Sequence, residues 1–164
     1  MSRVRLVILV CVAGACLFMA TSAQSEVDLK TYSGILCVES GVVSSSTLYY
    51  DSSGAQNDDA YTHSFICATT LDCYGLQNDS WIVLWDRNSS TNFSCSLVNR
   101  NAVTGSTYYG DAATTSGIEG PVQKTLDAPD TTPSYLVRYI SCSVPAKYSG
   151  NRSAVVGYAI DENC

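Results

Sequence analysis

The amino-acid sequence predicts an all-β protein, a disulfide-stapled antiparallel β-sandwich of about eight or nine short strands. Three observations predict it. Apolar and polar residues alternate with a period of two in several segments, as they do in strands that bury one face. Clusters of Ser, Asp, Asn, Gly and Pro, which favour turns, separate these segments. Six cysteines follow an N-terminal apolar segment, and cysteines of exported chains pair as disulfides.

Two segments show the alternation most clearly, NFSCSLV at 92–98 and YISCSVP at 139–145. In both, apolar residues and one cysteine fall on one strand face, and serines fall on the other. The residues expected to face inward are Phe93, Cys95, Leu97, Ile140, Cys142 and Val144.

Seven further strands are expected at 34–38, 46–50, 61–68, 80–86, 106–110, 122–126 and 153–161. The segment YTHSFICA at 61–68 places Tyr61, His63, Phe65 and Cys67 on one face. The segment SWIVLWD at 80–86 is apolar on both faces, which is typical of a central strand. Gly157, inside the last segment, indicates a close backbone approach or a bulge.

The N-terminus predicts a secretory signal peptide. Arg3 and Arg5 precede an apolar run at 6–19, and small residues follow it. This run is shorter than the roughly 20 residues that a membrane span needs. We therefore expect cleavage after residue 23, so that residues 1–23 form the signal peptide and residues 24–164 form a single β-sandwich domain. The alternative is lipid attachment at Cys16, within AGAC.

The six remaining cysteines are predicted to form disulfides. They are Cys37, Cys67, Cys73, Cys95, Cys142 and Cys164. Structural zinc usually needs cysteines two to four residues apart, together with histidines. The closest pair in the mature chain, Cys67 and Cys73, is more widely spaced, and His63 is the only histidine. We expect no metal site and no cofactor.

The charge of the chain excludes some partners. It has 9 basic and 15 acidic residues, a net charge of −6. Removal of the signal peptide with its two arginines leaves seven basic residues against fifteen acidic ones, a net charge of −8. Such a domain repels phosphate backbones and anionic membrane surfaces. Nucleic acid is therefore not an expected partner, and no membrane span is expected in the mature form.

No catalytic residue is predicted. A serine hydrolase needs a nucleophile, a base and an orienting acid. His63 is adjacent to Ser64, but neighbouring residues point to opposite faces of a strand, and no G-x-S-x-G segment occurs. Carboxylate pairs such as Asp79 with Asp86 occur in any acidic chain and do not indicate glycoside hydrolysis. The Asp-rich segment at 57–60 is the one calcium candidate, although the ordered D-x-D-x-D-G pattern is absent.

Trp81 and Trp85 are the strongest ligand-contact candidates. They share one face of the predicted strand, about 13 Å apart, where an exposed pair of indoles would stack on sugar rings. We expect instead that both pack in the core, because the opposite face, with Ile82 and Leu84, is also apolar. Further aromatic residues suited to a contact surface are Tyr49, Tyr50, Tyr108 and Tyr109.

The order of these features resembles a family of small exported bacterial proteins. The residues that carry the resemblance are Cys37, Tyr50, Gly54, Asn57, Cys67, Asp86, Cys95, Tyr139, Cys142 and Pro145. The chain departs from the family pattern at Ala68, where the family has proline, and in the additional Cys73 and Cys164. The resemblance implies a stapled β-domain outside the cytoplasm and supplies no catalytic residues.

The resemblance also implies a disulfide connectivity. The four family-like cysteines are expected to pair among themselves, and sequential strands are usually neighbours. This favours Cys37 with Cys67 and Cys95 with Cys142, and leaves Cys73 for Cys164. The competing interpretation pairs Cys67 with Cys73 across a short loop.

The sequence thus favours a secreted or periplasmic protein without catalytic activity, either a structural surface component or a binding module. Its expected partner is an unknown protein or glycan at the cell surface. The alternative is a carbohydrate-binding module that uses tryptophan and tyrosine faces, and a hydrolase is the third interpretation.

Overall fold

The computed structural model describes residues 27–41, 48–70 and 80–163. The predicted signal peptide and two of the predicted disulfide cysteines, Cys73 and Cys164, lie outside the described residues. In the described part, no helix has the length and apolar character that a membrane crossing requires.

The described residues form strands, with one short 3₁₀ helix between the first two. The elements are β1 (Val27–Ser33), η1 (Gly34–Leu36), β2 (Cys37–Glu39), β3 (Leu48–Asp51), β4 (Gly54–Asn57), β5 (His63–Ala68), β6 (Trp81–Asp86), β7 (Ser94–Asn101), β8 (Thr107–Tyr109), β9 (Ala113–Thr114), β10 (Glu119–Thr125), β11 (Leu136–Val144) and β12 (Ala154–Asn163).

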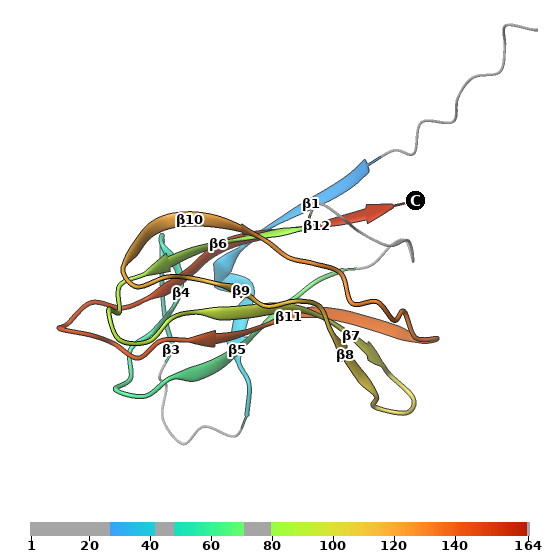
Figure 1. The fold of residues 1–164 in the computed structure, drawn as a ribbon, viewed down its shortest axis with the longest axis horizontal. Coiled ribbons are helices and arrows are strands. Elements are labelled where there is room, and N and C mark those ends of the chain that lie inside the picture. Colours follow the sequence, from blue (N-terminus) through green and yellow to red (C-terminus); the bar gives the residue numbers. More distant parts are fainter. Residues whose placement is uncertain (1–26, 42–47, 71–79, 164) are drawn as a thin grey trace, which may run out of the picture.

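The strands form two antiparallel sheets that pack face to face as a sandwich, which confirms the predicted fold class (Figure 1). Sheet A has the order β10-β6-β12-β4-β3, and β1 also pairs with β12. Sheet B has the order β2-β5-β11-β7-β8, and β9 also pairs with β7. β6 and β12 are therefore central in sheet A, as β11 and β7 are in sheet B.

The core lies between the sheets and consists of the inward-facing residues of both. Its largest fully buried apolar side chains are Phe65, Ile82, Leu84, Phe93, Leu97, Leu126, Ile140, Tyr158 and Ile160. The six residues predicted to face inward from the segments 92–98 and 139–145 are all buried. Burying each large apolar side chain contributes about 1.5–3 kcal/mol, so this layer dominates the stability of the fold.

Eight of the nine predicted strands are present with shifted ends, whereas the segment expected as a strand at 34–38 begins as the 3₁₀ helix η1 and is a strand only from Cys37. Three more strands join them in the described part of the chain. β1, β4 and β9 were not expected. β4 lies in a segment with the composition of a turn, and all four of its residues are buried. Its pairing with β3 and β12, rather than its local sequence, makes it a strand. Tyr61, expected to share one strand face with His63, Phe65 and Cys67, precedes β5 and is 73% exposed.

Two disulfides staple sheet B. Cys37 bonds to Cys67, and Cys95 bonds to Cys142, as the resemblance implied. In each case the two cysteines are direct register partners on neighbouring strands, β2 with β5 and β7 with β11. The pairing of Cys67 with Cys73 is therefore wrong. Two disulfides indicate an oxidising compartment outside the cytoplasm.

Two glycines allow other chain segments to approach β12. The register between β12 and β6 shifts between Val155 and Gly157, which confirms the predicted bulge. A Cβ on Gly34 or on Gly54 would lie within 2 Å of the Val155 carbonyl oxygen, at 1.8 and 1.9 Å respectively. Gly54 also has a backbone φ of +107°, a conformation that residues other than glycine rarely adopt.

Candidate functional site

The candidate site lies on the outer face of sheet A and begins with strand β6. In this strand Ile82 and Leu84 are fully buried in the core, whereas Trp81, Val83 and Trp85 are half-buried on the opposite face. The expectation that both tryptophans pack in the core is therefore wrong. β6 is central in its sheet, but only one face of that sheet meets sheet B, and the two aliphatic residues fill that face.

Small residues lie beside the indoles on the neighbouring strand. β12 pairs Ala154 with Trp85 and Ala159 with Trp81. Direct cross-strand partners point to the same face of a sheet, so alanine side chains flank both tryptophans. They are too short to cover the indoles, which explains why both rings retain solvent exposure.

A pocket of about 200 Å³ opens beside Trp85, where the β3–β4 hairpin, the end of β6 and the start of β12 meet. The polar and aromatic residues that line it are Asp51, Ser53, Gln56, Trp85, Arg87 and Arg152. Pockets for drug-sized ligands have volumes of about 300–1,000 Å³. This smaller pocket therefore suits one small polar group, such as a single sugar ring.

Asp51 is a fixed hydrogen-bond acceptor in the pocket. Its Oδ1 accepts a bond from the Ser53 backbone N–H at 2.7 Å and one from Gln56 Nε2 at 2.6 Å. These two bonds, the Ser53 bond first, lower the pKa of the Asp51 carboxyl, so it stays ionised. A carboxylate can accept about four hydrogen bonds, and Asp51 is exposed at the pocket, so it can accept further bonds from a ligand.

Arg152 is a fixed cation at the pocket. Its guanidinium contacts both oxygens of Asp58, at 2.7 Å from Nε to Oδ1 and 3.0 Å from Nη2 to Oδ2. Lys147 Nζ lies 2.7 Å from Asp58 Oδ1. Hydrogen bonds from Arg152 and Lys147 lower the pKa of Asp58, and Asp58 raises the pKa of Arg152. The Arg152 guanidinium also lies over the Tyr49 ring, 4.2 Å from its centroid.

Arg87, unlike Arg152, is held without an ion pair in the described part of the chain. Its backbone N–H donates to Ser153 Oγ at 3.0 Å, and its guanidinium carbon lies 3.5 Å from the centroid of the Trp85 ring. Among the described residues no carboxylate forms an ion pair with Arg87. Its charge is therefore compensated mainly by the aromatic ring, which this guanidinium partly covers.

The four candidate tyrosines are divided between the sheets. Their exposures are 43% for Tyr49, 45% for Tyr50, 36% for Tyr108 and 63% for Tyr109. Tyr49 lies next to the pocket, whereas the Tyr50 hydroxyl donates to the Cys37 carbonyl at 3.0 Å and joins the sheets. Tyr108 and Tyr109 lie on β8, at the edge of sheet B. Only Tyr49 therefore belongs to the same surface as the tryptophans.

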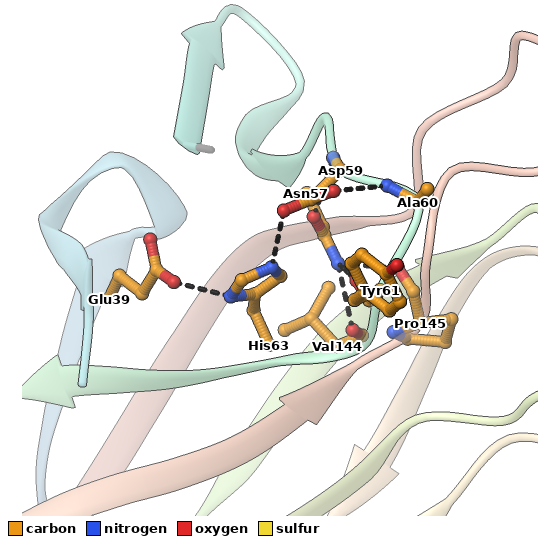
Figure 2. A network of polar contacts seen from close by, with 8 residues as sticks. All are labelled: Glu39, Asn57, Asp59, Ala60, Tyr61, His63, Val144 and Pro145. Carbon is orange, nitrogen blue, oxygen red and sulfur yellow. Dashed lines mark hydrogen bonds and ion pairs between the residues drawn. The ribbon is translucent and has the colours of Figure 1, made fainter. Parts of the chain in front are cut away.

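His63 lies in a polar network away from this face (Figure 2). Its Nδ1 contacts Glu39 Oε1, and its Nε2 lies 2.9 Å from Asp59 Oδ2. The bond to His63 lowers the pKa of Asp59. In the described part of the chain no hydroxyl contacts the imidazole. The two carboxylate contacts of His63 join β2 to the loop before β5.

Asn57 supports the same loop. Its Nδ2 lies 2.7 Å from the Tyr61 carbonyl oxygen and 3.1 Å from the carbonyl oxygens of Val144 and Pro145. Its Oδ1 accepts the backbone N–H of Asp59 at 2.9 Å (Figure 2). Asn57 therefore links β4 of sheet A to the end of β11 in sheet B.

The Asp-rich segment considered for calcium is engaged by cations of the protein. Asp58 pairs with Lys147 and Arg152, and Asp59 contacts His63. Within the described ranges no group of three or more His, Cys, Asp or Glu residues is placed to hold a metal ion. Asp79, the other carboxylate weighed with Asp86, lies outside the described residues.

No protein-family model, curated protein or solved structure matches this chain. The resemblance to small exported bacterial proteins therefore stays a prediction.

Proposed function

We propose that this protein is a secreted or periplasmic binding module without catalytic activity and that it recognises carbohydrate with the outer face of sheet A. The observation that carries the proposal is the half-exposed pair Trp81 and Trp85, on the same face as a pocket lined by fixed polar side chains. Sugar rings have apolar C–H faces and a rim of hydroxyls. An aromatic platform next to oriented donors and acceptors complements both.

The open platform is Trp81. The guanidinium of Arg87 partly covers the Trp85 ring, whereas among the described residues no cation lies over the Trp81 ring. Ala159 and Thr125 flank Trp81 on the neighbouring strands. A glycan that runs along β6 would therefore place one ring on Trp81 and a unit further along the glycan, rather than the adjacent one, at the pocket about 13 Å away.

The pocket supports binding rather than hydrolysis. Glycoside hydrolysis generally uses a pair of carboxyl groups about 5–10 Å apart. Among the described residues that line the pocket, Asp51 is the only one with a carboxylate. Its lowered pKa makes it a poor general acid at neutral pH.

A glycan array followed by calorimetric titration tests the proposal. The wild-type protein is expected to bind a glycan on the array, and Trp81→Ala is expected to weaken binding of that glycan about 10-fold or more through loss of the stacking surface. Tyr109→Ala, an exposed aromatic residue on sheet B, is the matched control and should bind as wild type does.

Two results would overturn the proposal. One is the absence of binding to every glycan on the array by folded wild-type protein. The other is binding that survives Trp81→Ala but is lost in Tyr109→Ala, which would move the contact surface to sheet B.

A further inference from the structure

The pocket holds a cation with no ionic partner in the described part of the chain. Three cationic side chains gather at this corner, Arg87, Lys147 and Arg152, and the last two share Asp58. Arg87 lines the pocket and contacts only the Trp85 ring and, through its backbone, Ser153. Its guanidinium N–H groups are therefore available to a ligand.

A guanidinium selects ligands by shape and charge. Its parallel N–H groups match the two oxygens of a carboxylate, and charge-assisted bonds of this kind are roughly twice as strong as neutral ones. A sugar hydroxyl has only one oxygen, which does not match the two parallel N–H groups, and it has no charge. The chemistry of Arg87 therefore favours a ligand with an anionic group.

Asp51 further restricts the chemical class of ligand that fits the pocket. It presents an ionised carboxylate to the same pocket, where it repels a simple anion such as sulfate or phosphate and accepts bonds from hydroxyl groups. A ligand that satisfies both residues carries a carboxylate at one position and hydroxyl donors at another. Sugars of the acidic classes, uronic and sialic acids, have both groups on one ring.

Resting on the proposed function, we propose that the sheet A pocket binds the carboxylate-bearing unit of an acidic glycan. Arg87 binds its carboxylate, and Asp51 accepts its ring hydroxyls. The negative net charge, −6 for the full chain and −8 without the predicted signal peptide, opposes approach of such a ligand at long range. At physiological ionic strength charges are screened within about 8 Å, so the local pair of Arg87 and Asp51 decides recognition.

The test compares ligands that differ only in the carboxylate. Oligogalacturonate and its methyl ester form one matched pair, and sialyllactose and its methyl ester form the other. We expect wild-type protein to bind the charged member of one pair about 10- to 100-fold more tightly than the neutral member. The pair that shows this preference identifies the uronic or the sialic class.

Substitution of Arg87 tests whether the preference for charged ligands arises in the pocket. Arg87→Gln is expected to reduce affinity for the charged ligand about 10- to 100-fold and to leave affinity for the neutral ligand nearly unchanged. Arg87→Lys keeps the positive charge but lacks the two parallel N–H groups, so its affinity for the charged ligand should lie between those of the wild-type protein and Arg87→Gln. Arg100→Gln, an exposed arginine on sheet B, is the control and should behave as wild type.

The outcomes separate this inference from the proposed function. Equal affinity for charged and neutral members, unchanged in Arg87→Gln, overturns the acidic-glycan inference but leaves a carbohydrate-binding module. Preference for the charged members that persists in Arg87→Gln also overturns the inference. Absence of binding to all four ligands and to the array overturns both.

Discussion

At the scale of single residues, Asp86 shows the structural role of a polar residue that carries the family resemblance. This fully buried carboxylate accepts bonds from the Asn88 and Phe93 backbone N–H groups at 2.9 and 3.4 Å, and it also accepts the hydroxyls of Thr115 and Ser153. One side chain thus connects the end of β6 to three other segments. Asp86 is therefore part of the hydrogen-bonded framework of the sandwich.

We predict that Asp86→Ala destabilises the fold by about 3 kcal/mol, because it leaves several buried donors without an acceptor. Urea denaturation followed by circular dichroism measures this loss. Asp130→Ala, an exposed aspartate, is the control and should change stability by less than about 0.5 kcal/mol. A loss as small as this control's in Asp86→Ala would show that the network is not structural.

Tyr158 predicts how stability changes at alkaline pH. Its side chain is fully buried, stacks on Tyr32 at 5.0 Å between ring centroids, and donates its hydroxyl to the Ala68 carbonyl at 2.5 Å. Burial, with a contribution from Tyr32, raises its pKa to about 12 from 10.0. The neutral hydroxyl therefore contributes stability that is complete below pH 10 and lost between about pH 10 and 12.

Tyr158→Phe isolates this effect. We expect a loss of about 1 kcal/mol at neutral pH from the missing hydrogen bond. Between pH 10 and 12 the wild-type protein should then lose stability more steeply than the variant. Parallel curves of unfolding free energy against pH for the two proteins would be inconsistent with a buried, neutral Tyr158.

At the scale of elements, the two disulfides have different positions in sheet B. Cys95–Cys142 joins the central strands β7 and β11, whereas Cys37–Cys67 attaches β2, which lies at the edge of the sheet. Their sequence separations, 47 and 30 residues, are similar in the loop-entropy model. Position in the sheet should therefore decide which bridge matters more.

We predict that Cys95→Ala with Cys142→Ala costs at least the roughly 4 kcal/mol of the entropic model, because cavities in the sheet centre add to it. Cys37→Ala with Cys67→Ala should cost less, since β2 can detach while the other strands stay paired. Urea denaturation of both double variants decides this. Greater damage from the edge pair would contradict it.

The elements were predictable to the extent that local alternation sets them. The buried faces of segments 92–98 and 139–145 follow from their own sequences. β4 does not, because its four residues contain a glycine, two amides and no alternation, and only its neighbours in sheet A make it a strand. The orientation of β6 could not be predicted from the sequence either. Both of its faces are apolar, so the pattern does not indicate which face meets sheet B.

At the scale of the whole molecule, the candidate site combines segments that are far apart in the sequence. Asp51 and Gln56 come from the β3–β4 hairpin, Trp85 and Arg87 from the end of β6, and Arg152 from the start of β12. The sequence drew attention to Tyr49 and the tryptophans, but it gave no signal for Arg87 or Arg152. Arg87 directly follows β6 and Arg152 lies just before β12, and only the strand order of sheet A brings them together.

Tryptophan fluorescence tests the central claim most directly, because the only two tryptophans of the chain lie on the proposed binding face. Acrylamide should quench the emission of the free protein, since both rings are half-exposed. Saturation with the glycan that binds best should shift the emission and protect it from quenching, and Trp81→Ala should lose most of that protection. A glycan that binds tightly while emission and quenching stay unchanged would contradict the assignment of the site to the outer face of sheet A.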